Sequence, residues 1–163
     1  MKGVTQTSFY DPDAPPREQR GNCLTAVVAS LLELPIEEVP NFVEDHVEHL
    51  GTADTKAAQA SEWYWWTALH RFIGEQGHRM YYLRNVEAHE PHPSHEDGFP
   101  DPEPGEFYTV SGISPRDPRI HHIVIYRDGE MVWDPHPDRT GLAKVDDEYH
   151  WSLRPLDAEE RAS

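Results

Sequence analysis

The chain has 163 residues, of which 37% are hydrophobic, and its 30 acidic and 14 basic side chains give it a formal net charge of −16. This length predicts one domain, 1–163, around one core, and the charge argues against nucleic acid or an anionic membrane as a partner. The N-terminal residues lack the apolar segment of a secretion signal, and no run of about 18 apolar residues occurs, so we expect a cytoplasmic protein.

Residues 5–22 are polar and contain three prolines, which predicts a loop or arm ahead of the first helix. Residues 24–34 are apolar on nearly all sides and predict a central, buried helix. Asn22 is suited to cap that helix, and Pro35 marks its end or a fresh first turn. Residues 35–39 predict a short second helix.

Residues 44–60 carry no motif and are assigned to a loop. Residues 61–76 predict the next helix, with Ser61 at its cap and Gly77 just beyond its end. The apolar stripe of this helix consists of Trp65, Trp66, Leu69, Phe72 and Ile73. Residues 63–66 are candidates for an aromatic wall of a substrate cleft, although packing in the core is the more common role of such side chains.

The second half of the chain is predicted to form strands at 80–83, 107–111, 120–126, 130–134 and 149–153. The acidic, proline-rich residues 86–106 predict a long loop, and the tail from about 157 is expected to fray. Because helices come first and antiparallel strands follow, this order predicts an α+β fold.

Cys23 is the only cysteine, so the chain cannot form an internal disulfide. A lone cysteine is most often a buried, inert core residue. At the first turn of a helix, however, the helix dipole and the free backbone N–H groups favour the reactive thiolate. A nucleophilic cysteine also needs a base, usually histidine, and a group that orients that base.

The sequence H-H-I-V-I-Y-R-D-G-E-M-V-W-D-P-H-P, which begins at His121, offers both groups in one predicted hairpin. A three-residue loop at 127–129 would place His122 directly opposite Asp134. A two-residue loop would place Asp134 opposite Ile123, with His121 as its diagonal neighbour. Asp-Gly also favours the two-residue turn, so the spacing leaves both histidines as candidates.

Taken together, G-N-C-L-T-A-V-V-A-S-L-L-E-L-P-I-E-E-V-P-N-F and this hairpin resemble the papain-like cysteine peptidase superfamily, specifically the C39-like group of small bacterial and phage proteins. The resemblance covers roughly residues 18–42 and 109–141. It implies a papain-like fold in which an N-terminal central helix packs on an antiparallel sheet. It also implies Cys23 as nucleophile, His122 as base and Asp134 as the orienting residue, since His122 directly precedes the aliphatic strand.

The family also places a glutamine upstream of the cysteine, where its amide helps to bind the oxyanion. Arg17 stands at the common spacing, so the candidates are Gln6 and Gln19. We prefer Gln6, because the N-terminal arm can run back past the start of the helix, whereas Gln19 is close to the helix start.

The resemblance implies a cysteine peptidase that hydrolyses a peptide or isopeptide bond through an acyl-enzyme. Its substrate would be a protein or peptide, with a basic target favoured by the acidity of the chain. Two alternatives stay open: the same triad could serve deamidation or transglutaminase-like acyl transfer, or the fold could be an inactive binding module.

We expect no cofactor and no metal. His89, His92 and His95 recur at intervals of three, as do His46 and His49, but no partner cysteine accompanies them. The first set lies in a proline-rich stretch unsuited to a helix, and a structural zinc site usually needs four ligands.

Overall fold

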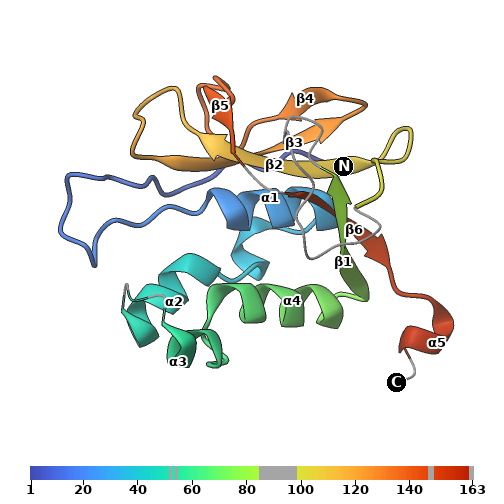
Figure 1. The fold of residues 1–163 in the computed structure, drawn as a ribbon, viewed down its shortest axis with the longest axis horizontal. Coiled ribbons are helices and arrows are strands. Elements are labelled where there is room, and N and C mark those ends of the chain that lie inside the picture. Colours follow the sequence, from blue (N-terminus) through green and yellow to red (C-terminus); the bar gives the residue numbers. More distant parts are fainter. Residues whose placement is uncertain (52, 54, 85–98, 147–148, 162–163) are drawn as a thin grey trace.

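Helices precede an antiparallel sheet along most of this chain, as the sequence predicts (Figure 1). The computed structural model describes residues 1–51, 53, 55–84, 99–146 and 149–161. The helices are α1 (Cys23–Leu32), η1 (Ile36–Glu38), α2 (Phe42–Leu50), α3 (Lys56–Gln59), α4 (Trp65–Glu75) and α5 (Ala158–Arg161). The strands are β1 (His78–Arg84), β2 (Phe107–Ile113), β3 (His121–Arg127), β4 (Glu130–Trp133), β5 (Lys144–Val145) and β6 (Tyr149–Pro155).

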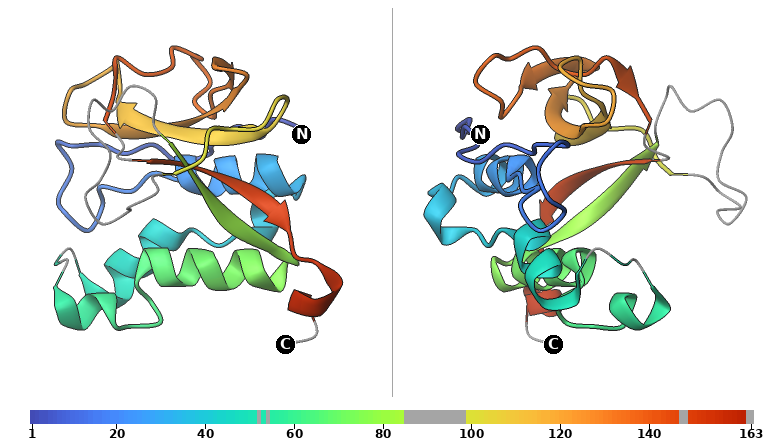
Figure 2. Two further views of the ribbon diagram at one scale, coloured as in Figure 1. Left: turned by 45° about the vertical axis from the view of Figure 1, so that its right-hand side comes forward. Right: turned by 90° about the vertical axis from the view of Figure 1, so that its left-hand side faces the viewer.

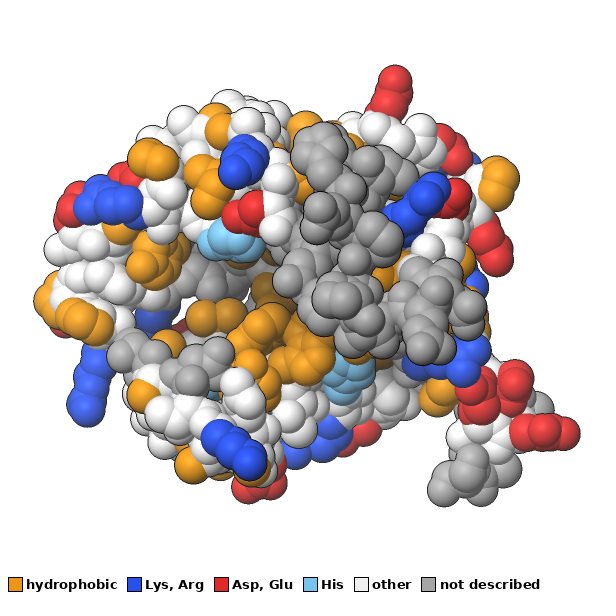
Figure 3. All heavy atoms as spheres, viewed as in Figure 1, with side chains coloured by type: hydrophobic (Ala, Val, Ile, Leu, Met, Phe, Trp, Pro, Cys, Tyr) orange, Lys and Arg blue, Asp and Glu red, His pale blue; other side chains and the backbone are white. Residues whose placement is uncertain are grey.

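The sheet has the strand order β1-β6-β2-β3-β4, with β5 added to β2, and the neighbouring strands pair antiparallel. Strand β6 joins the two parts of the sheet, because it pairs with β1 along its length and meets β2 where Trp151 lies opposite Thr109. The β1–β6 pair turns away from the direction of β2 and β3, and α4 packs beside β1 (Figure 2). This angle leaves a hollow lined by hydrophobic side chains between the helices and the sheet (Figure 3).

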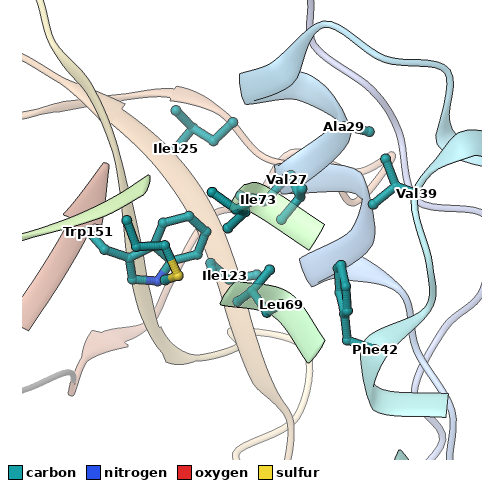
Figure 4. Close-up of a cluster of buried hydrophobic side chains, with 11 residues drawn as sticks. Val27, Ala29, Val39, Phe42, Leu69, Ile73, Ile123, Ile125 and Trp151 are labelled. Atoms are coloured by element: carbon teal, nitrogen blue, oxygen red, sulfur yellow. The ribbon is translucent and has the colours of Figure 1, made fainter. Parts of the chain in front are cut away.

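The main core lies between the helices and one face of the sheet (Figure 4). Its helical side chains come from α1, α2 and α4, and its strand side chains come from β1, β3 and β6. Among them are Val27, Phe42, Leu69, Ile73, Ile123, Ile125 and Trp151. Full burial of each of these side chains contributes roughly 1.5–3 kcal/mol relative to exposure, so α1 is fixed against β3 by its own hydrophobic surface.

A second cluster lies on the other face of the sheet and consists of Leu83, Tyr108, Val110 and Val124. Strand β3 therefore sends Ile123 and Ile125 into one core and Val124 into the other. Burial on both faces explains why the sequence of this strand is continuously apolar rather than alternating.

Helix α2 occupies residues that the sequence analysis assigned to a loop. Asn41 caps it, because its Oδ1 accepts a hydrogen bond from the N–H of Glu44 while its Nδ2 donates to the Glu44 carboxylate. This reciprocal arrangement at N-cap and N3 is a helix-start signal that the sequence contained. The loop assignment for 44–60 is therefore wrong over α2 and α3.

The start of α4 and the C-terminal tail also differ from expectation. Helix α4 begins at Trp65 instead of residue 61, because the Ser61 hydroxyl accepts from the N–H of Trp63 in a turn. Gly77 follows the helix with a φ of 72°, as predicted for the position after its end. The tail contains α5 where we expected fraying. In the predicted loop 86–106, residues 99–106 contain neither helix nor strand, while 86–98 lie outside the described residues.

The β3–β4 hairpin has a two-residue loop, since Arg127 pairs with Glu130. Both loop residues have positive φ, 52° at Asp128 and 83° at Gly129, as a type I′ turn requires. The three-residue loop that would have placed His122 directly opposite Asp134 is therefore wrong.

Candidate active site

Cys23 is the first residue of α1 and is partly exposed. The first-turn N–H groups of a helix have no partner within it, and the first turn of α1 contains no acidic residue. The positive end of the helix dipole therefore acts on the Cys23 sulfur without an opposing carboxylate in that turn.

A β-bulge brings His122 and Asp134 to the same face of the hairpin. The register shifts by one residue between the pairs Tyr126–Met131 and Ile125–Trp133. Counting on from the second pair places Asp134 level with Val124, two residues from His122. Side chains two residues apart on a strand share a face, so Asp134 lies on the face of His122. Without the bulge, the register of the two-residue turn would place Asp134 on the face of His121 instead.

Asp134 is a buried carboxylate, 1% exposed, that accepts three hydrogen bonds. They come from His122 Nε2 at 2.7 Å, the N–H of His136 at 2.8 Å and the N–H of Gly141 at 2.8 Å. Burial raises the pKa of Asp134, but these three donors outweigh it and the net pKa is lowered. Asp134 is therefore ionised at neutral pH.

His122 is 3% exposed, its Nε2 is hydrogen-bonded to Asp134, and it lines the same pockets as Cys23. An ionised carboxylate only accepts hydrogen bonds, so Nε2 carries the proton toward Asp134. Burial lowers the pKa of His122, yet the interactions with Asp134 and with Cys23 dominate and raise it to about 9. The imidazole is thus suited to remain protonated beside a thiolate.

His121 has a carboxylate partner of its own. Its Nε2 lies 2.9 Å and 3.0 Å from the two carboxylate oxygens of Asp146. Unlike His122, its side chain is 59% exposed. The structure thus pairs the two adjacent histidines with different carboxylates, and His122 is the one whose pKa is raised by Cys23 as well as by Asp134.

Gln6 lies in a small pocket that Cys23 and His122 also line. The side chain is 7% exposed, and its backbone N–H donates to the carbonyl of Pro135. Its Nε2 donates to the carbonyl of Ser8, and its Oε1 is buried without a hydrogen-bond partner. The N-terminal arm therefore runs back past the start of α1, as expected, and places a carboxamide beside the thiol.

Asn22 holds this arm instead of capping α1. Its Oδ1 accepts hydrogen bonds from the N–H groups of Thr7 and Ser8, and its Nδ2 donates to the Thr7 hydroxyl. No side-chain cap of α1 is formed by Asn22. Sequence reasoning assigned it to the helix because a cap is a local role, whereas these partners lie 14 and 15 residues away.

Arg139 ties the arm to the loop that follows Asp134. Its guanidinium donates to the carbonyl oxygens of Asp134 and His136 and to the hydroxyl of Thr5, and it lies 3.8 Å from the centre of the Trp133 ring. One side chain thereby connects the residue before Gln6 with the backbone of Asp134. No local sequence pattern around Arg139 indicates this role.

The other candidates upstream of Cys23 lie elsewhere. The Gln19 amide donates to the carbonyls of Pro12 and Ala14, and its oxygen accepts from the Tyr10 hydroxyl, so this side chain stabilises its own loop. Arg17 is exposed. Gln6 is consequently the glutamine that the structure brings to Cys23 and His122.

A cavity of about 720 Å³ opens beside Cys23 and His122, and it corresponds to the hydrophobic hollow of Figure 3. Trp65 and Trp66 line this cavity and also pack against the main core. Trp63 is exposed and stacks on His49, away from this cavity.

Across the described ranges, no group of histidine, cysteine and carboxylate side chains is arranged to hold a metal ion. His46 is buried on α2 with its ring edge-on to Tyr64, and His89, His92 and His95 lie outside those ranges. Within the same part of the chain, none of the helices has the length and apolar character to cross a membrane.

Comparison with known proteins finds no matching family model, no matching curated protein and no matching solved structure.

Proposed function

We propose that this chain is a papain-like cysteine peptidase that hydrolyses a peptide or isopeptide bond through Cys23, His122 and Asp134. The observation that carries the proposal is that His122 is hydrogen-bonded to the buried carboxylate of Asp134 and lines the same pockets as the Cys23 thiol, which raises the pKa of its imidazole. A partly exposed thiol at a helix N-terminus, next to a large cavity, is the environment in which cysteine acts as a nucleophile.

In the first step, the Cys23 thiolate attacks the substrate carbonyl and forms a carbon–sulfur bond. The backbone N–H groups at the start of α1 and the Gln6 carboxamide are the donors available to the oxyanion. For Gln6 this requires its Nε2 to leave the Ser8 carbonyl and turn toward Cys23, a rotation within the small pocket that they share.

In the second step, protonated His122 gives its Nδ1 proton to the leaving amine as the carbon–nitrogen bond breaks. A thioester remains on Cys23. Neutral His122 then takes a proton from water, the water oxygen attacks the thioester, and the carboxylic acid product leaves as the Cys23 thiolate re-forms beside protonated His122. Asp134 keeps the imidazole in one orientation and stabilises its charged form throughout.

The arrangement of α1 against β3 supports the papain-like fold that the sequence resemblance implies. The positions of Gln6 and of His122 also agree with that resemblance. An inactive binding module would not require a buried carboxylate, an imidazole and a thiol close together. Burial of a charged pair costs desolvation free energy, and a catalytic role gives a reason for the chain to carry that cost.

The test is to incubate the purified chain with a mixture of unfolded proteins and to identify new peptide termini by mass spectrometry. We expect new termini with the wild type and none with Cys23→Ser, which changes one atom and leaves the helix intact. If glutamine is converted to glutamate and no new termini appear, the activity is deamidation and not peptide hydrolysis. If no product depends on Cys23, the proposal is wrong and the chain is an inactive binding module.

A further inference from the structure

Three consecutive residues of the N-terminal arm bind the short segment of chain that begins at the end of β4. Each of them makes one hydrogen bond of 2.7–2.9 Å to this segment. The three pairs are Val4 with Trp133, Thr5 with Arg139, and Gln6 with Pro135. Residues 4–6 therefore take their position from residues 133–139, and the place of Gln6 beside the thiol depends on that segment.

Two of these three bonds depend on the Arg139 guanidinium. Its Nη2 donates directly to the Thr5 hydroxyl. Its central carbon lies 3.8 Å from the centre of the Trp133 ring, where a cation is attracted to the face of an indole. That indole donates to the Val4 carbonyl, and Gly3 lies so close to the ring that an added Cβ would come within 2.4 Å of it. The Arg139 side chain thus supports both contacts of the arm with side chains of the segment.

The same guanidinium stabilises the loop that orients Asp134. This loop supplies the N–H groups of His136 and Gly141 to the Asp134 carboxylate. Arg139 lies between these two donors in sequence, and its Nη1 donates to the carbonyl oxygens of Asp134 and His136. Backbone carbonyls that face inward need such a donor. Arg139 therefore stabilises the loop conformation in which both N–H groups point at Asp134.

The backbone of Arg139 has a conformation that favours glycine. Its φ is 55°, in the left-handed region that costs free energy for a residue with a Cβ atom. The hydrogen bonds of the guanidinium and its contact with Trp133 offset that cost. Strained backbone of this kind gathers at functional sites, where the surrounding contacts hold it in place. The chain thus carries a long side chain at a position where local structure favours none.

We propose that Arg139 is a positioning residue for hydrolysis: its guanidinium fixes the arm that carries Gln6 to the loop that orients Asp134. The oxyanion donor and the orienting carboxylate then keep one geometry around Cys23. Arg139 lies outside the lining of both cavities beside the thiol, so it acts through these residues and not on the substrate. This inference rests on the proposed function, because it takes Gln6 and Asp134 as parts of the catalytic machinery.

The first experiment removes the guanidinium with Arg139→Gly, a substitution that the positive φ accommodates. A displacement of about 1 Å in a catalytic group can cost on the order of 10²-fold in rate. We therefore expect kcat for peptide hydrolysis to fall by about 10²-fold, with KM within about threefold of wild type because the cavity is unchanged. Guanidinium chloride far below denaturing concentrations should restore part of kcat by binding over the Trp133 ring, and sodium chloride should not.

The second variant, Thr5→Val, keeps the shape of the side chain and removes only the hydroxyl that accepts from Arg139. We expect kcat to fall by about tenfold, the value of one hydrogen bond to a charged group. Combined with Arg139→Gly it should cause no further loss, since both substitutions break the same contact. Arg127→Ala is the matched control, because it removes an exposed guanidinium 5.1 Å from the Phe107 ring, at the turn of the same hairpin, and should leave kcat unchanged.

Hydrogen exchange at the Gln6 backbone N–H supplies a measurement that does not depend on activity. Its bond to Pro135 should open more often in Arg139→Gly, so we expect exchange at least about tenfold faster than in wild type. Wild-type kcat in the folded Arg139→Gly variant, or a loss that guanidinium does not reverse, overturns the inference and leaves the peptidase intact. Failure of the peptidase has a different signature: wild type cleaves no peptide, while exchange at Gln6 still responds to Arg139→Gly.

Discussion

The Oδ1 of Asp134 lies 2.7 Å from the Nε2 of His122, and the two residues meet because a β-bulge adds one residue to the strand between them. Without that residue, the two-residue turn at Asp128 and Gly129 would have aligned Asp134 with the face that His121 occupies. The identity of the base thus depends on a local irregularity of the hairpin.

The first prediction compares the two adjacent histidines. His122→Ala should lower peptide hydrolysis by about 10²–10⁴-fold, because it removes the general acid and base. His121→Ala should retain activity within about tenfold, since it removes only an exposed contact with Asp146. Steady-state rates of both variants on one peptide measure this, and the reverse order of effects would assign the base to His121.

The second prediction concerns the orienting carboxylate. Asp134→Asn keeps the size of the side chain but turns an acceptor of three hydrogen bonds into a group that also donates. We expect the rate of hydrolysis to fall by about 10²–10⁴-fold with a smaller change in KM, because the imidazolium loses its counter-charge. Near wild-type rates in a folded Asn variant would show that Asp134 has a structural role only.

The third prediction distinguishes the role of Gln6 as an oxyanion donor from the reactivity of the Cys23 thiol. Gln6→Ala should reduce peptide hydrolysis by about 10²–10³-fold, whereas alkylation of Cys23, which forms no oxyanion, should stay within about twofold of wild type. Asn22→Ala should show the same separation in weaker form, because Asn22 holds the arm that carries Gln6. If both reactions fall together, the arm positions Cys23 or His122 instead.

The fourth prediction concerns stability at acidic pH. His150 is buried beside the Tyr108 ring with its Nδ1 unpartnered, and burial lowers its pKa to about 4. The unfolded chain therefore binds a proton that the native state excludes. The stability that this provides is fully present above pH 6.5 and is lost as pH falls toward 4, a difference of about 3 kcal/mol.

Urea unfolding of wild type and His150→Phe at pH 7 and pH 4.5 measures this contribution. The phenylalanine variant keeps the ring packing and should lose less stability over that interval, while the carboxylates titrate in both proteins. Parallel pH profiles for the two proteins would contradict this prediction, because they would mean that His150 binds its proton equally well in the native and unfolded chains.

Much of the fold followed from periodic and turn signals in the sequence. The buried character of α1 and the apolar stripe of α4 were predicted correctly because local side-chain patterns determine them. Helix α2 was missed although Asn41 and Glu44 form a recognisable start, since its apolar content is low.

The sequence named the members of the candidate site but not the geometry that brings them together. Cys23, His122, Asp134 and Gln6 were all named from sequence, and the structure brings them together around one point. The bulge and the long-range contacts of Asn22 and Arg139 could not be predicted, because they arise from tertiary packing and not from local sequence.

The central claim is that His122 holds Cys23 as a reactive thiolate, and the most direct measurement is the rate of Cys23 alkylation by iodoacetamide at pH 6. Because the pKa of His122 is raised to about 9, the imidazolium is present at this pH. We predict that native Cys23 reacts at least about tenfold faster than in the urea-unfolded chain, and that His122→Ala abolishes the difference. Equal rates in native, unfolded and His122→Ala protein would contradict the account.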